Sequence, residues 1–187
     1  MNRINYITTI IGRRGCGKTE YIKGILDVYR NKENSINKLI IFDTADNKSY
    51  SKIPIIDVEK LKTVKSGYYR IISGKINDVM NMLTSLHNAL IIFEDATKYI
   101  QNRLTEEQRA IVFDSKQKNC DLIFVFHGFG YVPIDMYRIS DNLTIFKTLD
   151  KPFIRKQHII NYEGVEAMYN KVSEHSSEYH HDTLQIY

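Results

Sequence analysis

The stretch Gly12-Arg13-Arg14-Gly15-Cys16-Gly17-Lys18-Thr19 has the pattern G-x-x-x-x-G-K-T and decides the fold. It lies between the apolar residues 7–11 and the helix-forming residues 20–23. Glycines let successive N–H groups converge on an anion, and a helix beginning at Lys18 directs its positive dipole end at the same point. Lys18 is expected to reach the β- and γ-phosphates and Thr19 to reach Mg²⁺. The stretch therefore predicts a phosphate-binding loop, with all eight residues around ATP and Mg²⁺.

Composition indicates an ordinary globular protein. The chain has 187 residues, of which 43% are hydrophobic and 26% are charged, with a net charge of +4. We expect one domain over residues 1–187, because two would be small for this length. There is neither an apolar run long enough to span a membrane nor a signal-peptide core, which favours the cytoplasm. Two cysteines, Cys16 and Cys120, indicate free thiols rather than a disulfide framework.

Short β-branched runs alternate with helical patterns. We expect strands at residues 4–11, 39–42, 68–72, 89–93, 122–126 and 143–146, and helices at residues 18–30, 76–88 and 105–119. Continuous apolar strands are typical of a parallel sheet covered on both faces. Thr105 and Gln108 form a candidate capping box, and a helix followed by a strand from Thr183 is expected beyond about residue 157. The predicted fold is α/β, a three-layer P-loop NTPase with a mainly parallel sheet.

A second acidic motif ends the run at residues 89–93. Glu94 and Asp95 follow this buried strand, as in a Walker B motif, where one acid serves Mg²⁺ and the other serves the attacking water. By position we assign Glu94 to the metal with Thr19, and Asp95 to the water. An alternative for Asp95 alone is a helix N-cap. The sequence separation between Lys18 and Glu94 leaves room for two strands, which predicts the additional-strand (RecA/HerA-like) arrangement.

Two further side chains lie at expected strand ends. His127 follows residues 122–126, at the edge where open α/β sheets bind ligands, and is a candidate sensor of the γ-phosphate. The alternative is a loop histidine bonded to nearby backbone. Asp43 is a weaker candidate, because capping the following turn accounts for it equally well.

Hydrolysis also needs positive charge on the transition state, which a neighbouring subunit can supply through an arginine. Arg138 is our candidate, ahead of Arg109 and Arg103, although each arginine also fits a solvated surface position. The side chains of Arg13 and Arg14 are expected to point outward. Cys16 fits either an oxidation-sensitive thiol or simple space filling.

Two other groups carry weaker signals. Phe153 lies among four basic residues, a pattern that suits contact with a nucleic-acid backbone but equally a solvated charge cluster. The four are Lys147, Lys151, Arg155 and Lys156. His180 and His181 suggest a metal, but adjacent residues point in different directions, so a solvated tail is the alternative.

The order of these motifs resembles the HerA/FtsK superfamily. The resemblance spans about residues 4–150 and rests on the loop at 12–19, the strand ending in Asp43, the Glu94-Asp95 strand, and the segment from 124 through Arg138 to 146. Within the superfamily the chain is most similar to viral genome-packaging ATPases, with zonular occludens toxin-like phage assembly proteins as neighbours. Two departures are His127, where Gln or Asn is usual, and the Glu-Asp order of the acids.

The resemblance implies an ATPase that forms a ring, usually hexameric, with double-stranded DNA in its channel. The expected function is a DNA-translocating motor that packages a viral genome, in the host cytoplasm or at the packaging vertex of a virion. Capsid or membrane proteins would be further partners. The alternatives are an ATP-dependent phage assembly factor and a non-motor P-loop kinase or switch.

Overall fold

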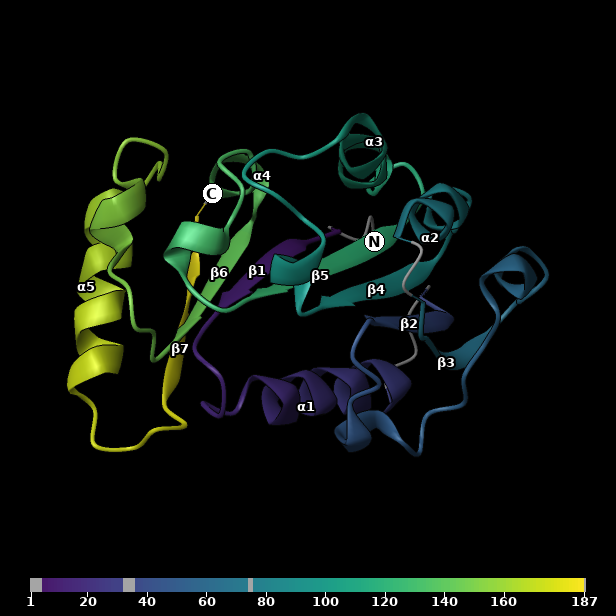
Figure 1. Ribbon diagram of the computed structural model, residues 1–187, viewed down its shortest axis with the longest axis horizontal. Coiled ribbons are helices and arrows are strands. Elements are labelled where there is room, and N and C mark those ends of the chain that lie inside the picture. Colours follow the sequence, from purple (N-terminus) through teal and green to yellow (C-terminus); the bar gives the residue numbers. More distant parts are fainter. Residues whose placement is uncertain (1–4, 32–35, 74–75, 187) are drawn as a thin grey trace.

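The computed structural model describes residues 5–31, 36–73 and 76–186, and its centre is a seven-stranded sheet in the order β3-β2-β4-β5-β1-β6-β7 (Figure 1). The strands are β1 (Ile7–Ile11), β2 (Lys38–Asp43), β3 (Gly67–Ile71), β4 (Ala89–Glu94), β5 (Cys120–Phe126), β6 (Asn142–Phe146) and β7 (His181–Gln185). All neighbours pair in parallel except β6 and β7, which are antiparallel. The predicted three-layer α/β fold is confirmed.

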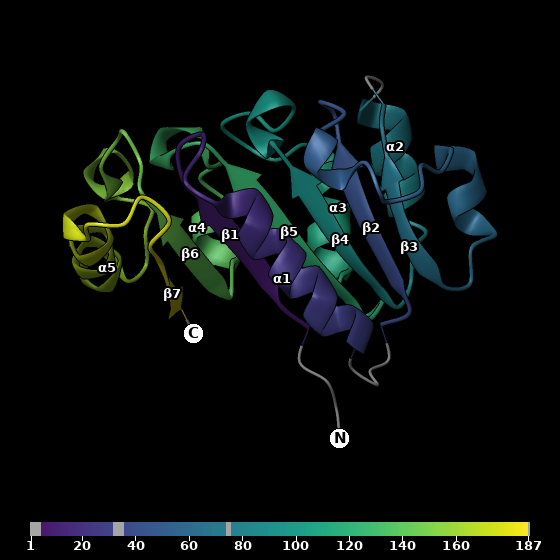
Figure 2. The same cartoon turned by 90° about the horizontal axis from the view of Figure 1, so that it is seen from below.

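Helices cover both faces of the sheet, which explains the continuous apolar strands. The helices are α1 (Lys18–Asn31), α2 (Ile76–Leu83), α3 (Glu106–Asp114), α4 (Met136–Ile139) and α5 (Tyr162–Glu174). Figure 2 shows α1 crossing one face, where Ile22 and Leu26 pack with Ile10, Ile92 and Val125. The other helices lie on the opposite face. Every residue of β4 and β5 is buried, so the sheet centre forms the core between the two helical layers.

The strand order places the two nucleotide motifs at one edge. β5 lies between β1 and β4, so the additional-strand arrangement expected from the motif spacing is confirmed. Leu122 of β5 pairs with Ile7 of β1 on one side and with Ile91 of β4 on the other, so the three strands are in register. Their carboxyl ends therefore meet at the same edge.

Most predicted elements are present, with shifted ends. Helices expected to reach residues 88 and 119 stop at Leu83 and Asp114, and each is followed by a turn ending in an asparagine. Asn88 and Asn119 have φ of 54° and 53°, the left-handed conformation that asparagine tolerates, and each directly precedes a strand. The Thr105 capping box is confirmed.

At the ends of the chain, β7 begins two residues before the expected Thr183, while Ile4 and Tyr187 lie outside the described residues. The four-residue α4 was not predicted. Among the helices that the structure describes, none combines the length and apolar character that a membrane crossing requires.

Gly24 offers a test of helix α1. It is an exposed residue inside the helix, and a Cβ at this position would meet no atom of another element within 4 Å. Gly24→Ala should raise the free energy of unfolding by about 0.5–1 kcal/mol, because alanine loses less backbone entropy in a helix. Urea unfolding followed by circular dichroism measures the change. An unchanged or lower midpoint would contradict a regular α1 at this position.

Candidate functional site

The loop between β1 and α1 has the backbone that a phosphate cradle needs. Gly15 and Gly17 have φ of 77° and 96°, a region that side chains other than glycine rarely adopt. Gly12 does not share this conformation: a Cβ there would lie 2.6 Å from the Cβ of Phe146, so glycine is required by close packing. Helix α1 begins at Lys18, as predicted, with its N-terminus at the loop.

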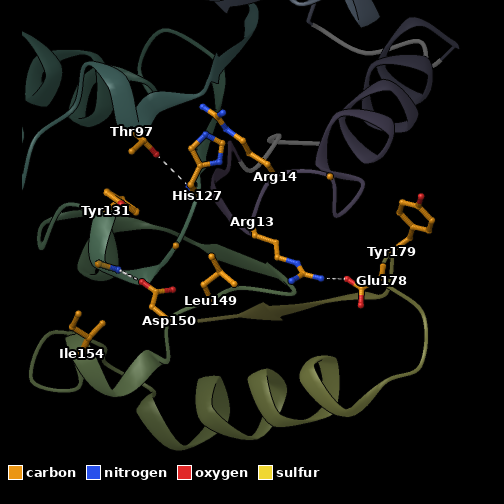
Figure 3. Close-up of a pocket in the computed structure, with 13 residues that line it drawn as sticks. Arg13, Arg14, Thr97, His127, Tyr131, Leu149, Asp150, Ile154, Glu178 and Tyr179 are labelled. Atoms are coloured by element: carbon orange, nitrogen blue, oxygen red, sulfur yellow. Dashed lines mark hydrogen bonds and ion pairs between the residues drawn. The ribbon is translucent and has the colours of Figure 1, made fainter.

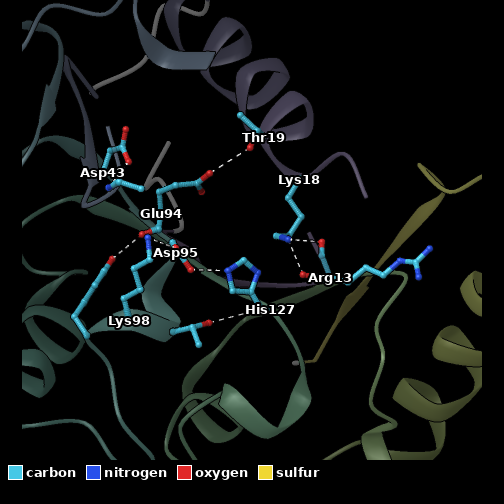
Figure 4. A network of polar contacts seen from close by, with 12 residues as sticks. Arg13, Lys18, Thr19, Asp43, Glu94, Asp95, Lys98 and His127 are labelled. Atoms are coloured by element: carbon cyan, nitrogen blue, oxygen red, sulfur yellow. Dashed lines mark hydrogen bonds and ion pairs between the residues drawn. The ribbon is translucent and has the colours of Figure 1, made fainter. Parts of the chain in front are cut away.

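Lys18 is buried, and its ammonium folds back onto the loop (Figure 4). Nζ donates to the carbonyl oxygens of Gly12 at 2.6 Å and Arg13 at 2.8 Å. Burial lowers the pKa of Lys18. Cys16 is also buried, and burial raises the pKa of its thiol, which favours space filling over reactivity. A phosphate entering the loop can exchange with the two carbonyls that hold the ammonium.

Glu94 connects the second motif to the first. Its Oε1 accepts hydrogen bonds from the hydroxyls of Thr19 and Tyr50, each at 3.3 Å. Its Oε2 is buried and has no hydrogen-bond partner. The side chain is nearly enclosed, and burial raises the pKa of Glu94 to about 7, against the opposing effect of Lys18. An enclosed carboxylate with one unused oxygen is suited to a cation.

These groups fit Mg²⁺ held together with nucleotide phosphates. Mg²⁺ keeps several waters and takes only one or two protein carboxylates when phosphates complete its shell. The Thr19 hydroxyl and the free Oε2 of Glu94 supply such oxygen donors. Within the described ranges no group of three or more His, Cys, Asp or Glu residues forms a separate metal site. The donor set therefore suits a phosphate-dependent ion rather than a permanently bound metal.

Asp95 has an unusual backbone and two charged neighbours. Its φ of 51° and ψ of 44° are left-handed. Its Oδ2 lies 2.6 Å from Nζ of Lys98, and its Oδ1 lies 2.6 Å from Nε2 of His127. The contact with His127 is close, but its direction does not meet hydrogen-bond geometry. Asp95 begins a short 3-10 helix at residues 96–98 without making a side-chain cap, so the N-cap alternative is not supported by a hydrogen bond.

His127 lies at the end of β5, as predicted, and faces Asp95. Burial lowers the pKa of its imidazole, although Asp95 opposes this effect. Its backbone N–H donates to the Thr97 hydroxyl at 3.2 Å, so the loops after β4 and β5 are connected. The ring itself makes no hydrogen bond to backbone, in contrast to the loop-histidine alternative.

A cavity of about 280 Å³ lies among these side chains. Lys18, Thr19, Glu94, Asp95 and His127 all line it. The structure thus brings together five residues from three separate segments of the sequence. Arg138 is the one predicted catalytic residue that does not line this cavity.

Asp43 also borders the cavity, but it is occupied with the turn that follows β2. Its carboxylate accepts from the backbone N–H groups of Ala45 at 3.1 Å and Asn47 at 2.7 Å. The buried Arg70 lies 3.7 Å from the same carboxylate. The capping interpretation of Asp43 therefore accounts for its contacts.

A larger cavity of about 970 Å³ adjoins the loop on the side of β6 and β7 (Figure 3). Its apolar lining comes from Tyr131, Leu149, Ile154 and Tyr179, and its polar lining includes Arg13, Arg14, Asp150 and Glu178. A Cβ on Gly17 would lie 3.2 Å from the ring of Tyr179. This cavity is large enough for a nucleoside beside the phosphate loop.

The chain after α5 contributes residues that sequence analysis missed. Glu178 forms an ion pair with Arg13 and, at 3.3 Å, with Lys147, so Arg13 is not directed freely outward. Arg14 is exposed, as expected, and lines both cavities. No local pattern identifies Glu178 or Tyr179, because their role depends on β7 pairing with β6.

The arginines predicted to act in trans lie elsewhere. Arg138 is exposed on α4, just before β6 begins, and borders a pocket that also includes Arg109. Because β6 runs parallel to β1, this end of the sheet is opposite to the phosphate loop. Arg138 therefore lies away from the nucleotide cavity of its own chain.

The basic cluster is largely engaged within the chain. Lys147 pairs with Glu178, Arg155 donates to Asn102 Oδ1 at 2.8 Å, and the Lys156 ammonium lies 5.0 Å from the centre of the Tyr162 ring. Phe153 and Lys151 are exposed. These contacts favour a structural role for most of the cluster.

The two histidines near the C-terminus make ring contacts. His180 stacks on His175 with ring centres 3.8 Å apart, and His181 stacks on Phe146 at 4.5 Å. Both are partly buried, which does not fit a fully solvated tail. Among the residues that the structure describes, neither belongs to a group of three or more His, Cys, Asp or Glu side chains that could hold a metal ion.

Comparisons with solved structures identify the same fold in known proteins. The genome packaging NTPase B204 of Sulfolobus turreted icosahedral virus 2 matches with a TM-score of 0.77 and 16% identity, over 98% of this chain and 92% of that one. Its complex with ATP-gammaS matches with a TM-score of 0.75 and 15% identity, over 97% of this chain and 92% of that one. B204 of Sulfolobus turreted icosahedral virus, described as a DNA-packaging ATPase, matches with a TM-score of 0.70 and 17% identity, over 100% and 94%.

No protein-family model and no curated protein sequence matches this chain. At such low identity the structural matches establish the P-loop NTPase fold. The resemblance to genome-packaging ATPases is thus confirmed at the level of the fold.

The raised pKa of Glu94 predicts a pH-dependent stability. The folded state holds this proton up to about pH 7, whereas an ordinary glutamate has a pKa of 4.5, so the free energy of unfolding should fall as the pH rises between these values. Glu94→Gln removes the effect and should be more stable than the unchanged protein by up to about 3 kcal/mol at pH 8. Near pH 4.5 the two should differ much less. Thermal unfolding in EDTA without nucleotide measures this, and an equal difference at both pH values would contradict it.

Proposed function

We propose that this chain is an ATP-hydrolysing motor that moves double-stranded DNA, as a viral genome-packaging ATPase does. The observation that carries the proposal is the convergence of Lys18, Thr19, Glu94, Asp95 and His127 around one cavity. A phosphate loop alone supports nucleotide binding. The additional acid, the strand-end histidine and the intervening strand β5 support hydrolysis.

ATP is accommodated across the two adjoining cavities. The phosphates enter the smaller one, where Lys18 exchanges its two carbonyl contacts for phosphate oxygens. The nucleoside occupies the larger one, against Leu149 and Tyr179. Arg13 and Arg14 add positive charge beside the phosphates. Both cavities border Arg14 and Gly15, so a single ligand can extend from one to the other.

Each charged residue has a role in hydrolysis under this proposal. Thr19 and Glu94 would hold Mg²⁺, which would neutralise negative charge on the phosphates. Asp95 accepts a proton from the attacking water, and His127 senses the γ-phosphate. Because Asp95 lies against His127 and Lys98 in the nucleotide-free chain, it must exchange at least one of these contacts to bind water.

The motor function rests on further support. B204, which has the same fold over nearly its whole length, is described as a genome-packaging enzyme. The position of Arg138 opposite its own site suits action on a neighbouring copy, in a ring that we propose to be hexameric with DNA in its channel. Packaging would place the ring at the vertex of a capsid in the host cytoplasm, where capsid or membrane proteins become partners.

Lys18→Ala tests nucleotide use and its coupling to DNA. The unchanged protein should hydrolyse ATP faster when duplex DNA is added, and Lys18→Ala should lose hydrolysis with and without DNA, because the lysine charge on the phosphates is gone. Phosphate release measures both rates. Lys171→Ala, which removes an exposed lysine paired with Asp182, is the matched control and should retain activity. ATP hydrolysis that does not respond to DNA would contradict the motor function but not the ATPase activity.

Asp95→Asn tests the assignment of the base. The variant should bind ATP with nearly unchanged affinity, because Asp95 does not contact the phosphate loop, but its turnover should fall by about 10² or more. Binding of a fluorescent ATP analogue and single-turnover hydrolysis separate the two effects. Full turnover in Asp95→Asn would move the base elsewhere, with Glu94 the first alternative.

A further inference from the structure

Tyr50 is a buried tyrosine whose hydroxyl is directed at the second acidic motif. It ends the short 3-10 helix at Lys48–Tyr50, which lies in the loop after β2. Only 1% of its surface is exposed. The ring packs in the same apolar cluster as Ile41 and Ile92, on the face of the sheet that α1 covers. Its hydroxyl donates to Oε1 of Glu94 at 3.3 Å. This contact joins the loop after β2 to the end of β4, although Tyr50 and Glu94 are 44 positions apart in the sequence.

The backbone that carries Tyr50 is fixed by its own polar contacts. Asn47 accepts a hydrogen bond from the Ser49 N–H at 3.0 Å and thereby caps the short helix. The N–H of Asn47 in turn donates to the carboxylate of Asp43, at the end of β2. Arg70 forms an ion pair with Asp46 at 2.8 Å and lies beside Asp43. Tyr50 is therefore held relative to the sheet edge from which Glu94 emerges.

The two oxygens of Glu94 are in different situations. Oε1 accepts from both Thr19 and Tyr50, whereas Oε2 is buried without a partner. Rotation of the carboxylate would break both hydroxyl contacts at once. Burial and the adjacent Glu94 raise the pKa of Tyr50 far above its usual value, so the phenol remains a donor. Thr19 alone cannot provide this constraint if its hydroxyl turns toward a bound ion.

We propose that Tyr50 is a positioning residue that orients the Glu94 carboxylate and keeps its Oε2 available to the Mg²⁺ of the bound nucleotide. The inference rests on the proposed function, because it assumes that Glu94 serves that ion. Tyr50 touches neither the nucleotide nor the reacting atoms. It acts through Glu94, and its loss should change the dependence on Mg²⁺ rather than the affinity for the nucleotide itself.

Tyr50→Phe removes the hydroxyl and keeps the buried ring, so the fold is retained. The experiment measures binding of a fluorescent ATP analogue in EDTA and during a titration with MgCl₂. Affinity in EDTA should be unchanged. The Mg²⁺ concentration that gives half-maximal enhancement of analogue binding should rise about tenfold, the usual size of the loss when a residue that supports a metal ligand is replaced. An unchanged Mg²⁺ titration, or an equal loss of affinity with and without Mg²⁺, would overturn the inference and leave Tyr50 with a packing role.

Tyr29→Phe is the matched control. Tyr29 also donates to a carboxylate, that of Asp121, but this pair lies near the beginning of β5, at the sheet edge away from the loop. Its Mg²⁺ titration should match that of the unchanged protein. If Tyr29→Phe shifts the titration as much as Tyr50→Phe, the effect is not specific to Glu94 and the inference fails.

A double variant locates the effect. In Glu94→Gln the response to Mg²⁺ is already weakened, so adding Tyr50→Phe should weaken it no further. Fully additive effects would show that Tyr50 acts independently of Glu94. Failure of the proposed function has different signatures. Without a nucleotide site the unchanged protein would show no Mg²⁺-dependent binding of the analogue, and without a motor its ATP hydrolysis would not respond to DNA.

Discussion

The parallel pairing of β1, β5 and β4 is the constraint on which the rest of the structure depends. These strands align so that their carboxyl ends meet at one edge, and Lys18, Asp95 and His127 follow those ends. Glu94 can then remain buried because the hydroxyls of Thr19 and Tyr50 satisfy one of its oxygens. A buried carboxylate with incomplete partners is costly for stability. The raised pKa of Glu94 expresses that cost, and an incoming cation would remove it.

Sequence analysis predicted the parts of this arrangement that depend on short-range physics. The G-x-x-x-x-G-K-T pattern is set by backbone conformation and charge within eight residues, and the strands are visible because apolar runs buried on both faces need no periodicity. The Thr105 cap is equally local. The predicted helix ends were less accurate. Asn88 and Asn119 adopt left-handed turns that composition alone does not distinguish from a continuing helix.

Contacts between distant segments could not be predicted. The approach of Asp95 to His127 and the hydroxyl of Tyr50 on Glu94 depend on how loops from separate strands fold over one edge. Tyr50 lies in a polar stretch with no recognisable pattern, so nothing in the sequence indicated it. The same applies to Glu178 and Tyr179, whose positions follow from the antiparallel β7. The roles of Asp95, His127 and Arg138 stay predictions, of which Asp95→Asn tests the first.

The contact of Glu178 with Arg13 joins residues 165 positions apart, and it has a consequence for how the protein is made. β1 emerges first from the ribosome, yet its two sheet neighbours, β5 and β6, are synthesised more than a hundred residues later. The wall of the larger cavity near Tyr179 comes later still. The phosphate loop therefore follows a strand that has neither of its sheet neighbours until β5 and β6 have been synthesised.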